Sequence, residues 1–427
     1  MFKIIFIVSL MTGAILSTVS AADISQRFNQ NQKVFTQDTS RPSQLSALVD
    51  ELLTTNPALQ AKQARVEASS AQYQADSQAL YNPELDVDYE NTDTDTSSIG
   101  ISQAIDWSDK RGGRKKLAQF RQQQSMAELQ LARQSLSAQL LQNLSSFHTA
   151  KDKNDLIQQR IELLSEFVAI ARKRFQSGDV NQAELSLARL AFADASMQRS
   201  RVASELMSAR QSLITLMGKR INQWPGLPIA LPAIDFQEEQ IQAIINKHPE
   251  LSVQSARIES AMAKVQLRRL EQNADPVIGV RAGRDDSNDL LGFNFSIPLN
   301  VRNTYKAEVY VVNAELIESE FESKNLSRQL KSQLISTASR YQLVRKTWMD
   351  WQTIGQSSMD KQFNLIRKQW QASEISSTEY FLQLNQTLET RLSAIELRQE
   401  FWSAWIDWLE ASSGIMQWLN LNNKTEK

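Results

Sequence analysis

The sequence predicts a mainly helical protein with a small β part, built as a tandem duplication of long antiparallel helical hairpins. Three observations lead to this prediction. Short segments recur about 190 residues apart, long stretches lack glycine and proline, and four short segments alternate apolar with polar residues. Only 12 glycines and 9 prolines occur in 427 residues, so the chain has few positions at which a compact domain could fold back. Elongated helices are therefore expected.

The duplication rests on three pairs of matching segments. They are NPAL at 56–59 with HPEL at 248–251, IGISQAI at 99–105 with LGFNFSI at 291–297, and RFQSGD at 174–179 with QWQASE at 369–374. The first two pairs are 192 residues apart and the third is 195 residues apart. Repetition at a fixed distance indicates a repeated structural unit. We therefore expect a first copy at 22–217, a linker at 218–247, a second copy at 248–414 and a tail at 415–427.

Each copy is expected to contain the same elements in the same order. A helix of about 24 residues opens at Pro57 or Pro249, since proline suits a first helical turn. The predicted strands are 85–90 and 99–107 in the first copy and 277–282 and 291–299 in the second. The polar segments between them, 91–98 and 283–289, predict β-hairpins with long acidic tips. Long helices are expected at 115–175 and 306–370, and return helices at 181–217 and 377–412.

The long helices carry a narrow apolar seam of the coiled-coil type. Leu136, Leu140, Leu144 and Phe147 are spaced by three and four residues. About 60 helical residues extend roughly 90 Å. The break at 177–179 predicts that the chain turns back there and forms an antiparallel pair of helices.

The first 21 residues have the layout of a secretory signal peptide. Lys3 precedes the apolar run from Ile4 to Leu16, and small residues follow at 19–21. No later stretch holds 18 consecutive apolar residues, so the sequence predicts no transmembrane helix after cleavage.

The four strands need additional strands, because they are too few for an isolated wide sheet or a closed barrel. Large apolar residues such as Phe293 alternate with small or polar ones such as Asn294. A soluble sandwich buries such an apolar face, whereas an outer-membrane barrel turns it to lipid. The alternation fits both, and hairpins capping a soluble helical bundle remain an alternative. The export signal, the acidic tips and the length of the helices favour the barrel.

Composition argues against several other classes of function. The 47 basic and 48 acidic residues leave a net charge of -1, which indicates no nucleic-acid partner. Without cysteine the chain has no thiolate metal site. The two histidines, His148 and His248, lie in different copies and have no partner at metal-ligand spacing. We expect no catalytic residue, no metal site and no cofactor, and hence no enzyme.

Several segments together resemble a known family. They are NPALQAKQARVEAS, NPELDVDYEN, ISQAIDWSDKRGGR, RFQSGDVNQAELSLARL, HPELSVQSARIESA and GFNFSIPLNVRNTYKAE, with Gly218 and Gly414 after the return helices. In this order they resemble the outer-membrane efflux family, the TolC-like channel proteins, and within it most resemble the CzcC-type heavy-metal efflux branch.

The resemblance implies a homotrimer in the outer membrane that extends into the periplasm. Each subunit would give four strands to one lipid-embedded β-barrel and its long helices to a hollow α-helical tunnel. The trimer would dock on a periplasmic adaptor and an inner-membrane pump and passively conduct substrate, with heavy-metal cations the expected cargo in this branch. Export of drugs or secreted proteins, and a non-channel structural coiled-coil protein of the envelope, remain alternatives.

The resemblance also assigns site residues. The helical tips, where the adaptor would bind, carry Phe175, Gly178, Asp179, Trp370, Ser373 and Glu374. Ala372 and Ser373 stand where the family often has a glycine. Glu184 and Glu379, shortly after the tips, would form the entrance constriction and attract cations. They could equally be acidic residues favoured by the helix dipole. DKRGGR at 109–114 would be a flexible crossing from strand to helix, or an ordinary glycine turn.

Overall fold

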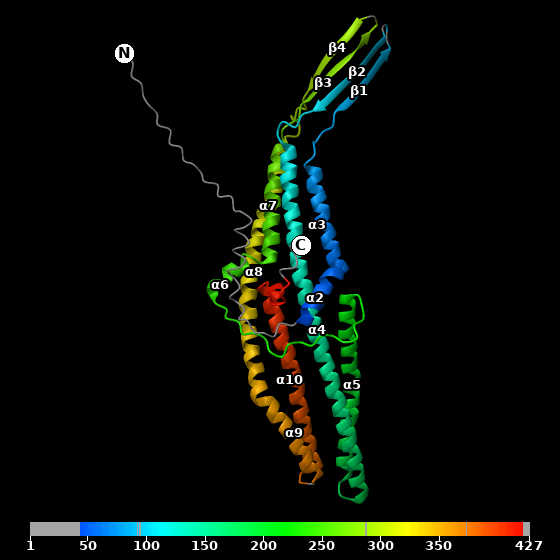
Figure 1. The fold of residues 1–427 in the computed structure, drawn as a ribbon, viewed down its shortest axis with the longest axis vertical. Coiled ribbons are helices and arrows are strands. Elements are labelled where there is room, and N and C mark those ends of the chain that lie inside the picture. Colours follow the sequence, from blue (N-terminus) through cyan, green and yellow to red (C-terminus); the bar gives the residue numbers. More distant parts are fainter. Residues whose placement is uncertain (1–42, 92, 94, 287, 373, 422–427) are drawn as a thin grey trace, which may run out of the picture.

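The computed structural model describes residues 43–421, apart from residues 92, 94, 287 and 373. The signal peptide expected at 1–21 and the end of the tail expected at 415–427 lie outside the described residues. The molecule is elongated, with a four-stranded sheet at one end and two helical hairpin tips at the other (Figure 1). This is the predicted fold class.

Most of the length is helical. The helices are α2 (Ser43–Thr55), α3 (Pro57–Asp76), α4 (Lys110–Ser177), α5 (Gln182–Met217), α6 (Glu238–Ile245), α7 (Pro249–Leu270), α8 (Lys306–Asp350), α9 (Gln356–Gln371), α10 (Ser377–Ala411) and α11 (Ile415–Trp418). A π-helical turn at Trp351–Gly355 separates α8 from α9. The long helix of the first copy is therefore continuous, whereas that of the second copy is interrupted.

Local sequence sets where these helices begin and end. Asn56 accepts a hydrogen bond from the N–H of Ala58 at 2.9 Å, and His248 Nδ1 accepts one from the N–H of Glu250 at 3.3 Å. Each cap precedes a proline in the first turn, as expected for a helix start. α4 ends at Gly178, whose φ of 86° is the left-handed conformation that glycine adopts without strain.

Two hydrophobic cores hold the helices together. The first, here called the equatorial core, includes Leu52 of α2, Leu144 of α4, Tyr341 of α8 and Trp405 of α10. The second, called the tip core, lies nearer the helical tips and is formed by α4, α5, α9 and α10 around Phe167. The linker runs across the equatorial core, where the Tyr341 hydroxyl donates to the Pro232 carbonyl at 2.6 Å.

The helical part differs from the prediction in four places. α4 begins at Lys110, so 110–114 is the first helical turn and a flexible crossing is not formed. Asp109 caps this start by accepting from the N–H of Gly112 at 3.1 Å. The short helices α2 and α6 and the π-turn were not expected.

The strands are β1 (Glu84–Asn91), β2 (Asp95–Ala104), β3 (Val277–Asp285) and β4 (Asn288–Ser296). They form one antiparallel sheet in the order β1-β2-β3-β4, so the hairpins of the two copies pair through β2 and β3. The predicted long acidic tips are wrong. The pairing extends to Asn91 with Asp95 and to Asp285 with Asn288. Most of the predicted tip residues are strand.

Candidate functional site

One face of the sheet is apolar and uncovered. Leu85, Ile101, Val280 and Phe293 lie side by side across the four strands in the observed register. Their exposed fractions are 70%, 52%, 53% and 71%. The other exposed apolar side chains on this face are Val87, Tyr89, Ile99, Ile278, Leu291 and Phe295. An uncovered apolar face of this size marks a surface that contacts lipid or another protein.

The opposite face is polar and carries small residues. In the next row of the sheet, Asp86 is aligned with Gly100, Arg281 and Gly292. Ser102 donates to the Asp86 carboxylate at 2.9 Å. Alternate residues therefore divide the sheet into an apolar face and a hydrophilic face, as in a barrel with a polar lumen.

The sheet has two open edges. Among the described residues, β1 pairs only with β2 and β4 pairs only with β3. Each outer strand therefore presents a row of backbone N–H and C=O groups without a strand partner. Unprotected edges are ready to accept another strand.

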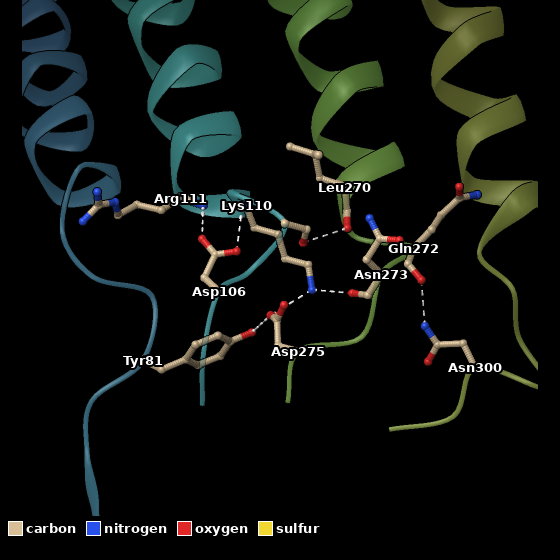
Figure 2. A network of polar contacts seen from close by, with 10 residues as sticks. Tyr81, Asp106, Lys110, Arg111, Leu270, Gln272, Asn273, Asp275 and Asn300 are labelled. Carbon is tan, nitrogen blue, oxygen red and sulfur yellow. Dashed lines mark hydrogen bonds and ion pairs between the residues drawn. The ribbon is translucent and has the colours of Figure 1, made fainter. Parts of the chain in front are cut away.

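A buried ion pair joins the two copies where the sheet meets the helices (Figure 2). Lys110 Nζ lies 2.8 Å from Asp275 Oδ2, and these side chains are only 11% and 6% exposed. Lys110 also donates to the Asn273 carbonyl at 2.6 Å, and the Tyr81 hydroxyl donates to Asp275 at 2.6 Å. Lys110 and Tyr81 come from the first copy, whereas Asn273 and Asp275 come from the second.

The same junction holds the start of α4 in place. The Asp106 carboxylate accepts from the backbone N–H groups of Lys110 and Arg111, each at 2.8 Å (Figure 2). The hydrogen bond to Asp275, assisted by burial and by the charge of that carboxylate, raises the pKa of Tyr81 to about 12. The phenol therefore stays a donor at physiological pH. The junction is a defined polar network.

The first helical tip is formed as expected. Gly178 ends α4, and the N–H of Asp179 donates to the Arg174 carbonyl at 2.8 Å. The Ser177 hydroxyl donates to the Asp179 carboxylate at 2.7 Å. Phe175 is 38% exposed at this end. The structure therefore brings Phe175, Gly178 and Asp179 together on an accessible turn.

The second tip differs in one important residue. Glu374 is exposed, and its N–H donates to the Gln369 carbonyl at 2.8 Å, which repeats the Asp179 bond of the first tip. Ser373 lies outside the described residues. Trp370 is only 3% exposed, so its side chain is not accessible at this tip, and the adaptor contact expected there stays a prediction. Its ring stacks on Tyr380 with centroids 4.3 Å apart and an interplanar angle of 8°.

Trp370 instead ties the two helical hairpins together. Its ring lies 5.5 Å from that of Phe167 in α4, and the Arg174 guanidinium lies 5.6 Å from the Trp370 centroid. Phe167 in turn lies 5.8 Å from Tyr380 in α10. The tip core thus joins α4 of the first copy to α9 and α10 of the second.

Glu184 and Glu379 occupy the same position in the two return helices. Each is the third helical residue, and its backbone N–H is capped by Asn181 Oδ1 at 3.0 Å or by Ser376 Oγ at 3.1 Å. Glu184 is half-buried and Glu379 is exposed. Acidic residues in a first helical turn interact favourably with the helix dipole. This geometry accounts for their position without a channel role, and it also leaves Glu379 accessible.

Two helix faces are apolar and exposed. Leu190, Met197 and Met207 lie on α5, each between 68% and 73% exposed. Tyr310, Ile317 and Phe321 lie on α8, between 52% and 77% exposed. No described helix is both long and apolar enough to cross a membrane. The described residues also contain no cluster of three or more His, Asp or Glu suited to a metal ion.

A model of the outer membrane efflux protein family matches residues 48–219, which is most of the first copy. This match shows that the first copy is similar in sequence pattern to outer membrane efflux proteins. The chain is also similar to a curated protein, the cobalt-zinc-cadmium resistance protein CzcC of Cupriavidus metallidurans, with 23% identity over 254 residues. That match covers 58% of this chain and 61% of CzcC, about three fifths of the relative's length.

Solved structures show the same fold over nearly the whole described chain. A membrane protein from Pseudomonas aeruginosa superposes with a TM-score of 0.74 at 15% identity, covering 89% of this chain and 95% of that structure. The CmeC outer membrane channel of Campylobacter jejuni superposes with a TM-score of 0.73 at 15% identity, covering 89% and 88%. At this level of identity, the superpositions show that the chain shares the fold of these membrane proteins.

Proposed function

We propose that this chain is an outer membrane efflux protein, the exit duct of a tripartite efflux system, and works as a homotrimer. The observation that carries the proposal is the four-stranded sheet with one bare apolar face and two open edges. Contact with lipid would bury the apolar face. Pairing β4 of one subunit with β1 of the next would give both edges a strand partner. Three subunits would give twelve strands, enough for a closed barrel.

The helical part supports the same assembly. The exposed apolar faces of α5 and α8 belong to different copies and to different edges of the subunit (Figure 1). In a ring of three subunits, each α5 face would pack beside the α8 side of a neighbour. Apolar area removed from water in this way stabilises an obligate oligomer. The helices would then surround a tunnel that continues the barrel.

We infer the direction of transport from the two ends of the molecule, the sheet and the helical tips. The sheet would lie in the outer membrane, and the helical tips would point into the periplasm toward an adaptor and an inner-membrane pump. Phe175, Gly178, Asp179 and Glu374 are the accessible tip residues that would contact the adaptor. Glu184 and Glu379 would line the entrance and favour cations. The duct would be passive, with transport driven by the pump.

We infer that heavy-metal cations are the substrate class, since the curated relative is named for resistance to cobalt, zinc and cadmium. A passive duct needs no tight metal site, because a cargo that binds tightly leaves slowly. The test is the metal and drug tolerance of cells that lack the gene, complemented with wild type. Sensitivity to cobalt, zinc or cadmium alone supports the substrate class. Sensitivity only to drugs contradicts heavy-metal cations as the substrate class but is still consistent with an exit duct.

Planar-bilayer conductance of the detergent-purified protein tests the duct itself. We expect a trimer with a small cation-selective conductance, and we expect Glu184→Gln/Glu379→Gln to weaken that selectivity. Selectivity unchanged by the substitutions removes the two glutamates from the entrance. A monomer that stays in solution without detergent contradicts the duct and favours a structural coiled-coil protein.

A further inference from the structure

A cavity of about 670 Å³ lies in the helical part, where α8 passes into α9. Its walls come from α4, α10 and the π-turn, and the linker residues 226–229 also line it. The cavity separates the equatorial core, to which Trp348 and Trp402 belong, from the tip core, which begins on α4 at Ile157. Its volume is in the range of small-molecule sites.

The π-turn builds one wall of this cavity. Trp351 begins the turn and Gly355 ends it, and a Cβ added at Gly355 would collide with the Trp351 ring. Glycine therefore allows the indole to lie against the helix backbone. In the first copy, α4 runs without interruption through the corresponding residues 156–160. π-turns within α-helices are frequent at functional sites.

Three tryptophans line the cavity, namely Trp348, Trp351 and Trp402. Trp348 is 8% exposed, and its indole N–H has no hydrogen-bond acceptor among the described residues. A buried donor without an acceptor is costly. The cavity therefore combines aromatic walls with one donor that an occupant could satisfy.

The charges around the cavity leave one carboxylate without a partner. Asp152 forms an ion pair with Arg398. Arg391 also interacts with another group, so it is not a free cation in the cavity. Asp155, one turn further along α4, makes no ion pair or hydrogen bond with any residue that the structure describes. Burial lowers the pKa of His148, so this cavity residue stays neutral at physiological pH.

We propose that this cavity binds a planar organic cation that carries a hydrogen-bond acceptor. The tryptophan faces attract a cation through their ring electrons, Asp155 supplies the opposite charge, and the acceptor meets the Trp348 indole N–H. The site lies on the helices, away from the sheet. It goes beyond the exit-duct function and does not depend on it.

The test is a fluorescence titration of the purified full-length protein with berberine, a flat cation with a permanent charge and ether oxygens. We expect saturable binding of one molecule per chain. Asp155→Asn should weaken the affinity about tenfold, since it removes the opposite charge. Trp351→Leu should weaken it roughly two- to thirtyfold. The control is Glu162→Gln, which removes an exposed carboxylate of α4 outside the cavity and should leave the affinity unchanged.

Two results would overturn the proposal. One is equal berberine affinity in wild type and Asp155→Asn. The other is equally tight, competitive binding of the aromatic anion anilinonaphthalenesulfonate, which would mean that any apolar molecule fills the space. Bilayer conductance of the same samples reports on the duct separately. Berberine binding to a monomer that stays in solution without detergent would contradict the duct and retain the site, and a conducting trimer without berberine binding would do the reverse.

Discussion

Lys110 Nζ and Asp275 Oδ2 lie 2.8 Å apart in a buried junction that connects the first copy to the second. Removing one partner of a buried pair leaves an uncompensated charge. We expect Asp275→Asn to lower the free energy of unfolding by about 3–5 kcal/mol. The double substitution Lys110→Met/Asp275→Leu should recover most of that loss. Urea unfolding of the detergent-solubilised protein measures both, and a double variant as unstable as Asp275→Asn would contradict the explanation.

His248 caps α7 and is only 5% exposed, and burial lowers its pKa. Because the folded state resists protonation, stability should be full above about pH 6.5 and fall as the pH decreases below it. His248→Asn repeats the Asn56 cap of the first copy and cannot be protonated. We expect its apparent melting temperature to change less than that of wild type between pH 7.5 and 5.5. His148 also has a lowered pKa and accounts for a residual slope. Identical slopes would exclude His248 as a contributor.

Trp370 and Phe175 occupy matching positions in the two tips but differ in burial, at 3% and 38% exposed. Trp370→Ala should cost about 3–5 kcal/mol, as expected for removing a buried aromatic ring. Phe175→Ala should change stability by less than about 0.5 kcal/mol. If the tip core holds the proposed entrance closed, only Trp370→Ala should raise the bilayer conductance. Equal effects of the two substitutions would argue against the tip core as the link between the hairpins.

Gly178 has a φ of 86° with open space around its Cα. Gly178→Ala should therefore destabilise the first tip by backbone strain alone, by about 1–2 kcal/mol. Gly226→Ala is the matched control, since that glycine also has open surroundings but no positive φ. Hydrogen exchange of the α4 and α5 ends should show the effect locally. A comparable loss in Gly226→Ala would mean that strain at the turn is not the cause.

Phe293 and Asn294 are neighbours on opposite faces of β4. If the apolar face contacts lipid, Phe293→Lys should weaken membrane insertion by about 2–4 kcal/mol, whereas Asn294→Lys should be tolerated. Folding into lipid vesicles, followed by tryptophan fluorescence, measures the difference. Tolerance of lysine at both positions would contradict a lipid-facing sheet.

The strands and long helices were predictable because their signals are periodic. The alternation of Leu291 and Phe293 with Gly292 and Asn294 indicated the apolar face correctly, and the apolar seam of α4 indicated an unbroken helix. The end of α4 and the start of α5 were equally predictable, since Gly178 and the cap at Asn181 are local features. Signals of this kind depend only on neighbouring residues.

The hairpin tips were predicted incorrectly because composition misled. Acidic and threonine-rich residues are poor strand formers, yet the cross-strand register extends to Asn91 and Asp95. The helix α2 did carry a signal, because Leu45, Leu48, Val49 and Leu52 have helical spacing and all are buried. Reading that spacing would have located the helix.

The site was only partly predictable. The Lys110 and Asp275 pair joins residues 165 positions apart, and no local pattern indicates which lysine meets which aspartate. The burial of Trp370 likewise depends on Phe167 and Tyr380, which come from other helices. Gly355, a glycine inside an otherwise helical stretch, is a weak sequence signal for the π-turn.

The pairing of β2 with β3 has a consequence for the order in which the protein is made. Ile101 pairs with Val280, 179 residues further along the chain. Such a distant contact is entropically expensive to form early and slows folding. The first hairpin therefore waits with the outer edge of β2 unpaired until the second copy has been made. A chaperone that binds unpaired apolar strands would protect the first hairpin during this time. The sheet would then be among the last parts of the subunit to form.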